Sequence, residues 1–240
     1  MEESVCMIRL DKYLADMDMG TRSEIKKAIR QGMIKVDDVT VKKPELKVDA
    51  DTQKIAVNGK EVVYRRMEYY MMNKPAGVVS ATKDPKEKTV LGLFKGQRRK
   101  DLFPVGRLDK DTVGLLLVTN DGELSHRLLA PGKHVDKIYY AKIDGEVNSE
   151  DADAFAQGID IGDEKLTLPA RLEILTSGKE SEIRLTIQEG RFHQVKRMFE
   201  ARGKKVIYLR RESMGTLVLD PQLREGEYRP LTEEELKKLC

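Results

Sequence analysis

The first third of the chain changes from helical to strand-like hydrophobic spacing. Four apolar residues recur at helical intervals and predict an amphipathic helix over residues 9–18: Leu10, Tyr13, Leu14 and Met17. Thr21 and Glu24 are three residues apart, the spacing of a capping box, and predict a second helix over about 22–31. Both helices end at glycines.

Short alternating runs follow these helices. Residues 33–36 and 39–41 predict strands on either side of Asp37-Asp38, and Asn58-Gly59 is a strong hairpin signal. We therefore expect a small ααβ unit over residues 1–60, and it is too short to be the whole protein.

Residues 61–68 are expected to connect this unit to a larger domain over residues 69–240. Strands are predicted at 69–72, 115–118, 138–147, 181–188 and 206–209, and helices at 123–129, 150–157 and 192–202. Thr232 and Glu235 repeat the capping-box spacing and open a last short helix. Strands and helices do not alternate as regular βαβ units, so the pattern favours an α+β fold.

Composition places the chain among soluble globular proteins. Of its 240 residues, 40% are hydrophobic and 35% are charged. No apolar run approaches the roughly 20 residues that cross a bilayer, and the N-terminus lacks the features of a signal peptide. We expect a cytoplasmic protein with no membrane contact.

The sequence gives no sign of a metal or a cofactor. Cys6 and Cys240 lie at opposite ends, and the three histidines show no metal-ligand spacing. No glycine-rich phosphate loop of a familiar kind occurs. We expect neither a metal nor a cofactor, although Asp109 and Asp111 leave a metal-dependent hydrolase open as an alternative.

Positive charge is concentrated in two segments of a nearly neutral chain. Residues 191–211 hold eight Lys or Arg and one acid, and residues 95–110 hold six and two, whereas the whole chain carries only +3. Such local patches are typical of polyanion binding, and a solvated surface is the alternative.

The segment GRLDKDTVG, residues 106–114, places carboxylates beside cations between two glycines. It is either a polar turn or a site that holds one ionised carboxylate for chemistry. Four ordered blocks decide how we interpret it: GRLDKDTVGLLLVTNDG at 106–122, MMNKPAGVVS at 71–80, DKIYYAKI at 136–143 and EGRFHQVKRMFEARGKKVIYLRR at 189–211. Together they resemble the bacterial rRNA pseudouridine synthases of the RsuA family, and residues 9–36 resemble the S4 RNA-binding domain.

This resemblance implies a catalytic domain with a mixed, mainly antiparallel sheet and flanking helices, preceded by an S4-like domain. It implies that Asp109 is the catalytic carboxylate, that Tyr139 stacks under the flipped uracil, and that Lys196 pairs with the aspartate. Arg107 is similar to the arginine that helps extrude the target nucleotide. The S4 match departs at Asp37-Asp38, where relatives often carry Asn-Gly, so the turn conformation is open.

Helix geometry separates two neighbouring cations. At 100° per residue, Lys196 falls at the edge of an apolar stripe and can turn inward, whereas Arg197 falls opposite the stripe and should face solvent or phosphate. On spacing alone, an ordinary boundary lysine is the favoured interpretation of Lys196, and a core residue is the favoured interpretation of Tyr139. Basic side chains expected to contact RNA are Arg107, Arg22, Lys26, Lys27, Arg30, Arg191 and Arg197.

The sequence thus predicts a monomeric enzyme that converts one uridine to pseudouridine, with rRNA in a ribosomal subunit or assembly intermediate as its partner. The short C-terminus favours 16S rRNA. A 23S rRNA enzyme of the same branch and a non-catalytic RNA-binding or ribosome-assembly factor are the alternatives.

Overall fold

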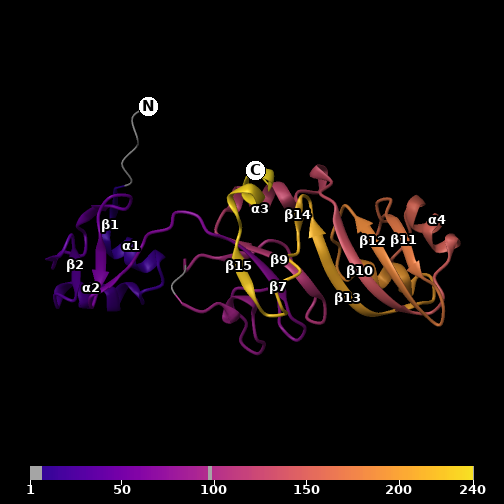
Figure 1. Ribbon diagram of the computed structural model, residues 1–240, viewed down its shortest axis with the longest axis horizontal. Coiled ribbons are helices and arrows are strands. Elements are labelled where there is room, and N and C mark those ends of the chain that lie inside the picture. Colours follow the sequence, from indigo (N-terminus) through magenta and orange to yellow (C-terminus); the bar gives the residue numbers. More distant parts are fainter. Residues whose placement is uncertain (1–6, 97–98, 240) are drawn as a thin grey trace. The chain divides into compact units, whose positions relative to one another are not determined.

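The computed structural model describes residues 7–96 and 99–239 and divides into two compact units (Figure 1). The first unit contains the described residues up to Glu68 and those of Lys95–Leu102. The second contains Tyr69–Phe94 and the described residues from Phe103 onward. Cys6 and Cys240 lie outside the described residues. No helix in the described ranges has the length and apolar character needed to cross a membrane.

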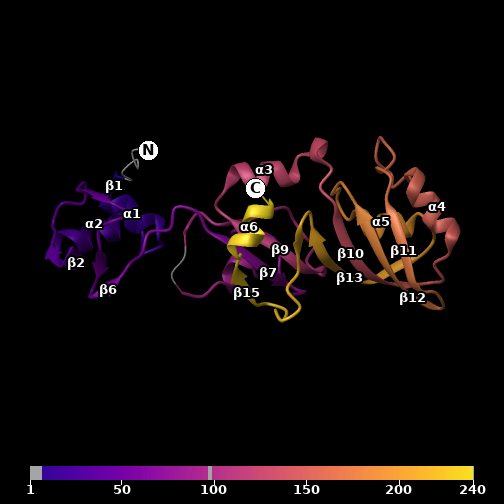
Figure 2. The same cartoon turned by 45° about the horizontal axis from the view of Figure 1, so that its top comes forward.

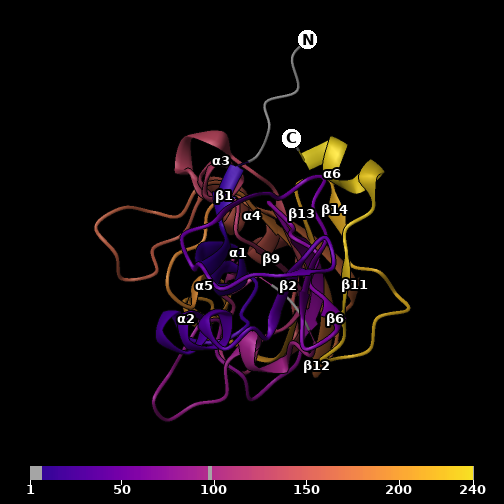
Figure 3. The same cartoon turned by 90° about the vertical axis from the view of Figure 1, so that its left-hand side faces the viewer.

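The first unit combines two helices with small sheets. Helix α1 (Leu10–Asp16) and helix α2 (Arg22–Arg30) lie side by side (Figure 3). The predicted capping box is confirmed, because the Thr21 hydroxyl accepts from the Glu24 amide and the Glu24 carboxylate accepts from the Thr21 amide. One sheet has the order β3-β2-β5-β6 and another pairs β1 with β4; their bounds are β1 Met7–Arg9, β2 Ile34–Val36, β3 Val39–Thr40, β4 Lys47–Asp49, β5 Ile55–Val57 and β6 Lys60–Glu61.

Asp37-Asp38 forms the tight turn that the sequence left open. Both residues have positive φ, 48° and 65°, the conformation that a two-residue hairpin of the I′ type requires and that Asn-Gly adopts most readily. The Asp37 carboxylate offsets this strain by accepting hydrogen bonds from the Lys54 amide at 2.9 Å and from the Gln53 side chain at 2.8 Å. Two aspartates therefore serve as the turn.

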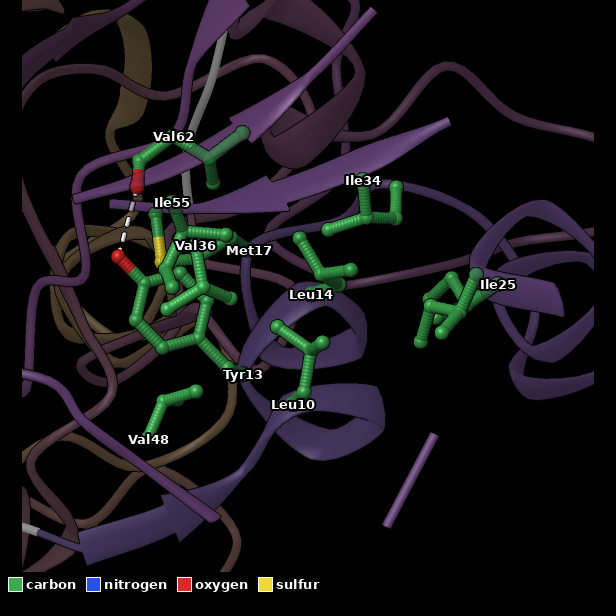
Figure 4. Packing of buried hydrophobic residues seen from close by; sticks show 11 residues of the cluster. Leu10, Tyr13, Leu14, Met17, Ile25, Ile34, Val36, Val48, Ile55 and Val62 are labelled. Carbon is green, nitrogen blue, oxygen red and sulfur yellow. Dashed lines mark hydrogen bonds between the residues drawn. The ribbon is translucent and has the colours of Figure 1, made fainter. Parts of the chain in front are cut away.

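The core of this unit extends past its expected boundary. Val62 is 2% exposed and packs with residues of α1 and the sheet, and its carbonyl accepts a 2.6 Å hydrogen bond from the buried Tyr13 hydroxyl (Figure 4). The segment 61–68, expected to connect the two units, therefore packs at Val62 into the core of the first unit.

The Lys95–Leu102 segment joins the same unit from a distance in sequence. Arg99 is almost fully buried; its guanidinium lies over the Tyr64 ring at 5.2 Å and pairs with Asp101 at 2.6 Å and Asp16 at 3.6 Å. Its amide also donates to the Glu68 carboxylate at 2.9 Å. The contacts of Arg99 with Asp16, Tyr64 and Glu68 thus attach this segment to the first unit.

Among the described residues of the second unit, nine strands form one sheet. Its main order is β11-β12-β10-β13-β9-β7-β15, with β14 on β13 and β8 on β9. The bounds are β7 Tyr69–Lys74, β8 Phe103–Pro104, β9 Val113–Thr119, β10 Lys137–Asp144, β11 Arg171–Thr176, β12 Glu180–Ile187, β13 Lys205–Met214, β14 Leu217–Val218 and β15 Tyr228–Pro230. Within this sheet β13 and β9 run parallel and the other pairs are antiparallel. The predicted mixed, mainly antiparallel α+β fold is confirmed.

The described residues of the second unit also form four α-helices: α3 (Gly122–Leu129), α4 (Ser149–Gln157), α5 (Gln194–Glu200) and α6 (Glu233–Leu239). Helix α4 lies against β11 (Figures 1 and 2), and Phe155 of α4 meets Phe199 of α5 edge to face at 5.1 Å. The expected start of α5 at residue 192 is wrong, because His193 has a left-handed φ of 49° and stands just before the first helical residue.

Candidate active site

Asp109 lies on the loop that joins β8 to β9, and two side chains from the start of α5 approach its carboxylate. Lys196 Nζ is 3.1 Å from Asp109 Oδ2, and His193 Nε2 is 3.6 Å from Asp109 Oδ1. The aspartate side chain remains 25% exposed. The family resemblance implied that Lys196 pairs with Asp109, and the structure places the two side chains in contact.

Lys196 also contacts a second carboxylate of the loop, with its Nζ 2.6 Å from Asp111 Oδ1. Burial alone would lower the pKa of Lys196, but its hydrogen bonds to Asp111 and Asp109 outweigh burial, and the net pKa is raised. Burial likewise opposes ionisation of Asp111, but the hydrogen bond from Lys196 leaves the pKa of that carboxyl lowered. Lys196 is therefore a fixed positive charge beside Asp109 at neutral pH.

The position of Lys196 follows from the packing of α5. Val195, Met198 and Phe199 are buried, and Lys196 stands at the edge of that stripe with its side chain 18% exposed. Its aliphatic stem covers the stripe while the ammonium reaches the loop.

Helix geometry predicted that Arg197 faces solvent or phosphate, but in the structure its side chain bonds to other parts of the protein. Its guanidinium pairs with Asp163 at 2.6 Å and donates to the carbonyls of Ile161 and Phe192. Arg191 has a similar role, because it pairs with Glu189 and Asp163 and donates to the Lys165 and Leu166 carbonyls at 2.6 and 2.7 Å. Since loop carbonyls and carboxylates satisfy both guanidinium groups, they brace residues 161–166, and this geometry does not favour phosphate contact.

Lys74 is a site residue to which the sequence gave no role. Strand β7 continues through Asn73 and Lys74, where a break was predicted, and the Lys74 side chain is completely buried. Its Nζ donates to the carbonyls of Thr112 at 2.8 Å, Asp109 at 2.9 Å and Pro75 at 3.0 Å. Burial lowers the pKa of Lys74 to about 8, so the ammonium still carries its proton at neutral pH. Lys74 thereby holds the backbone of the Asp109 loop.

Gly114 closes this loop against the sheet. It has φ of 103° and pairs with Arg211 across the parallel β9–β13 contact; a Cβ there would lie 2.3 Å from the Arg211 carbonyl oxygen. The glycine is thus required by the close approach of two backbones, whereas Gly106, with φ of 75°, lines the adjoining groove.

A pocket of about 60 Å³ adjoins Asp109 and is lined on one side by Tyr139 of β10. Tyr139 is only 7% exposed, with a leucine and an isoleucine of the sheet nearby, so its ring is both part of the core and a wall of the pocket. The pocket adjoins a groove of about 1170 Å³, and Arg107, Asp109 and His193 line both. An aromatic wall beside a carboxylate suits a planar base and its sugar.

Several predicted RNA contacts remain available. The Arg107 side chain is exposed on the groove, and the structure gives it no hydrogen bond or salt bridge to any described residue. The four basic side chains of α2 likewise have no hydrogen bond or salt bridge to any described residue. Arg22, Lys27 and Arg30 are exposed, and Lys26 is half-buried. These groups can neutralise phosphates without breaking an existing pair.

The hydrolase alternative is not favoured by this geometry. In the described ranges, no three His, Cys, Asp or Glu side chains gather as a metal-binding group. The oxygens of Asp109 and Asp111 converge on the Lys196 ammonium, a cation that already offsets half of their charge.

Comparison with known proteins agrees with this architecture. The family model described as RNA pseudouridylate synthase matches residues 68–201, and the S4 domain model matches residues 8–54. One solved structure, titled as a crystal structure of pseudouridylate synthase, is 40% identical with a TM-score of 0.69, covering 97% of this chain and all of that one.

Full-length relatives carry related names. An uncharacterized RNA pseudouridine synthase, YtzG, of Bacillus subtilis is 47% identical and covers 97% of this chain and 98% of its own. The ribosomal small subunit pseudouridine synthase A of Vibrio cholerae is 42% identical over 97% and 99% of the two chains; that of Escherichia coli K12 is 41% identical over 95% and 98%. The chain belongs to the RNA pseudouridylate synthase family and carries an S4 domain ahead of its catalytic domain.

Proposed function

We propose that this protein converts one uridine of small-subunit rRNA to pseudouridine and that Asp109 is the reacting carboxylate. The observation that carries the proposal is the position of Asp109, at a pocket with an aromatic wall and beside the Lys196 ammonium. Relatives of nearly equal length that are named for the small ribosomal subunit support the choice of substrate.

The reaction breaks the N1–C1′ bond of uridine, turns the base and joins C5 to C1′, with no net redox change. It needs a carboxylate near C1′, as a nucleophile or as a base on the sugar. The target must leave its stack to reach the pocket, and we assign Tyr139 to stack on the extruded uracil and Arg107 to grip the strand or fill its place. Lys196 keeps a positive charge next to Asp109 throughout.

RNA affinity in this proposal comes mainly from phosphate contacts. Only 5% of the residues are aromatic and none is tryptophan, so base stacking contributes a minor share. Arg107 would act at the pocket, and the α2 side chains Arg22, Lys26, Lys27 and Arg30 would anchor structured RNA from the S4 domain. We also propose that the protein acts in the cytoplasm as a monomer.

Release of tritium from [5-³H]uridine in 16S rRNA tests the function, because the new carbon–carbon bond replaces the C5–H bond. We expect release by the wild-type protein and at least a thousandfold less by Asp109→Asn, with unchanged RNA binding. Equal release by both proteins would contradict the role of Asp109. Release from 23S rather than 16S transcripts would replace the substrate, and binding without any release would favour a non-catalytic assembly factor.

A further inference from the structure

Phe192, two residues before the start of α5, is the most exposed large hydrophobic side chain among the described residues, at 73%. Single exposed apolar side chains are common on protein surfaces, so exposure alone assigns no role. Phe192 differs from the others because its ring stacks on the neighbouring His193 ring and because it lies on the groove.

The ring of Phe192 is held by its neighbours. It stacks on the His193 ring with centroids 3.8 Å apart and planes 18° from parallel, so one face is covered. His193 has a left-handed φ of 49°, and the Phe192 carbonyl accepts a 3.1 Å hydrogen bond from Arg197. A residue with strained backbone persists where its surroundings fix it, and such positions cluster at functional sites.

The location of the pair links it to the reacting carboxylate. Phe192 lines the groove, whereas His193 lines both the groove and the small pocket, with Nε2 3.6 Å from Asp109 Oδ1. A strand that reaches the pocket along this groove could therefore present its next nucleotide to the uncovered face of Phe192.

We propose that Phe192, backed by His193, is a stacking subsite for the nucleobase adjacent to the target uridine. This inference rests on the proposed function and adds a second base-binding position to it. Every base presents a π face, so the subsite accepts any base and holds the register of the strand. It reduces the loss of freedom on binding because the Phe192 ring already stacks on His193 without RNA.

The test compares Phe192→Leu, which keeps the apolar bulk, with Phe192→Tyr, which keeps the ring. Val218→Ala is the matched control, because Val218 is an exposed residue of β14 that lines neither the pocket nor the groove. With the [5-³H]uridine 16S transcript, we expect Phe192→Leu to raise KM at least about fivefold with kcat within about twofold. Phe192→Tyr and Val218→Ala should behave as the wild type does.

Two further measurements isolate stacking. Abasic nucleotides placed in turn on either side of the modified uridine should remove the difference between wild type and Phe192→Leu at one of the two positions. Filter-binding Kd of the same transcript, which needs no turnover, should rise for Phe192→Leu by the same factor.

Failure of the two proposals looks different. If the wild type is active and all variants have equal KM and Kd, the stacking subsite is overturned and the function stands. The same conclusion follows if the effect of Phe192→Leu persists on both abasic RNAs, or if Phe192→Tyr shows an equal effect. Absent tritium release overturns the function, and the Kd comparison then decides the subsite alone.

Discussion

Lys74→Met removes the ammonium that holds the backbone of the Asp109 loop while keeping a side chain of similar length. Three carbonyls within 3.0 Å lose a charged donor, and each such bond is worth about 1.5–3 kcal/mol. Burying that charge costs the folded protein about 3 kcal/mol, from a pKa lowered from 10.5 to about 8. At neutral pH we therefore expect a net loss of about 1–6 kcal/mol in the free energy of unfolding.

The pH dependence has a definite sign. Folded Lys74 gives up its proton near pH 8, whereas the unfolded chain keeps it to about pH 10.5. Between these values the unfolded chain binds more protons, so the wild-type free energy of unfolding rises with pH by up to about 3 kcal/mol. The variant lacks this contribution, and the stability gap between the two proteins widens from about pH 8 to about pH 10.5.

Activity should change in the opposite direction. A neutral amine has two hydrogens for its carbonyl acceptors and no charge, so the loop loses support as pH rises through about 8. We expect the kcat of the wild type to fall above that pH and Lys74→Met to show kcat reduced by about 10- to 100-fold without that inflection.

Urea denaturation followed by circular dichroism, at pH values from about 7 to about 10, measures the stability gap, and tritium release measures kcat. Lys133→Met is the control, because Lys133 is an exposed residue outside the loop and the sheet. A gap that stays constant with pH, or a kcat equal to that of the wild type, would refute the reasoning.

Three other substitutions test the remaining contacts. Lys196→Met should lower kcat by about 10- to 1000-fold with little change in RNA affinity, measured by tritium release and filter binding; a loss confined to affinity would contradict its place beside Asp109. Arg197→Ala should destabilise the protein by about 1–3 kcal/mol in urea denaturation and leave the slope of log Kd against log salt unchanged. Arg22→Ala, in contrast, should reduce that slope by about one. The reverse result would indicate that Arg197 contacts phosphate. Gly114→Ala should lower the free energy of unfolding by about 2–5 kcal/mol, because the new Cβ clashes with Arg211. Gly122→Ala is the control, because a Cβ at Gly122 meets no atom within 4 Å. Equal stabilities of the two variants would show that β9 and β13 leave room for a side chain at residue 114.

Local signals in the sequence predicted local structure well. The capping box at Thr21 and the Asn58-Gly59 hairpin are confirmed because each depends on residues within four positions. Strand β15 escaped prediction for the opposite reason, because it is three residues long and exists by pairing with the distant strand β7. Strand β11 was not predicted either; its residues alternate, but none is fully buried, and it forms a hairpin with β12.

Contacts between segments that are distant in the chain could not be predicted from the sequence either. The burial of Val62 and the Arg99–Asp16 pair depend on partners far along the chain, and neither Val62 nor Arg99 has a distinctive local pattern. The same limit applies to Lys74, although a lysine two residues after the apolar run Tyr69–Met72 and directly before Pro75 was a usable signal. A buried lysine requires several acceptors, and a loop that must be held in place supplies them.

The acids and bases that lie side by side in residues 106–114 have different partners in the structure. Lys110, next to Asp109 in sequence, pairs with Glu87 at 2.8 Å, and Arg107 extends into the groove. The cations that act on Asp109 come instead from β7 and α5: Lys74 fixes its backbone and Lys196 faces its carboxylate. Because one cation positions the main chain and the other the side chain, loss of Lys74 should alter stability and turnover together, whereas loss of Lys196 should alter turnover with a smaller change in stability.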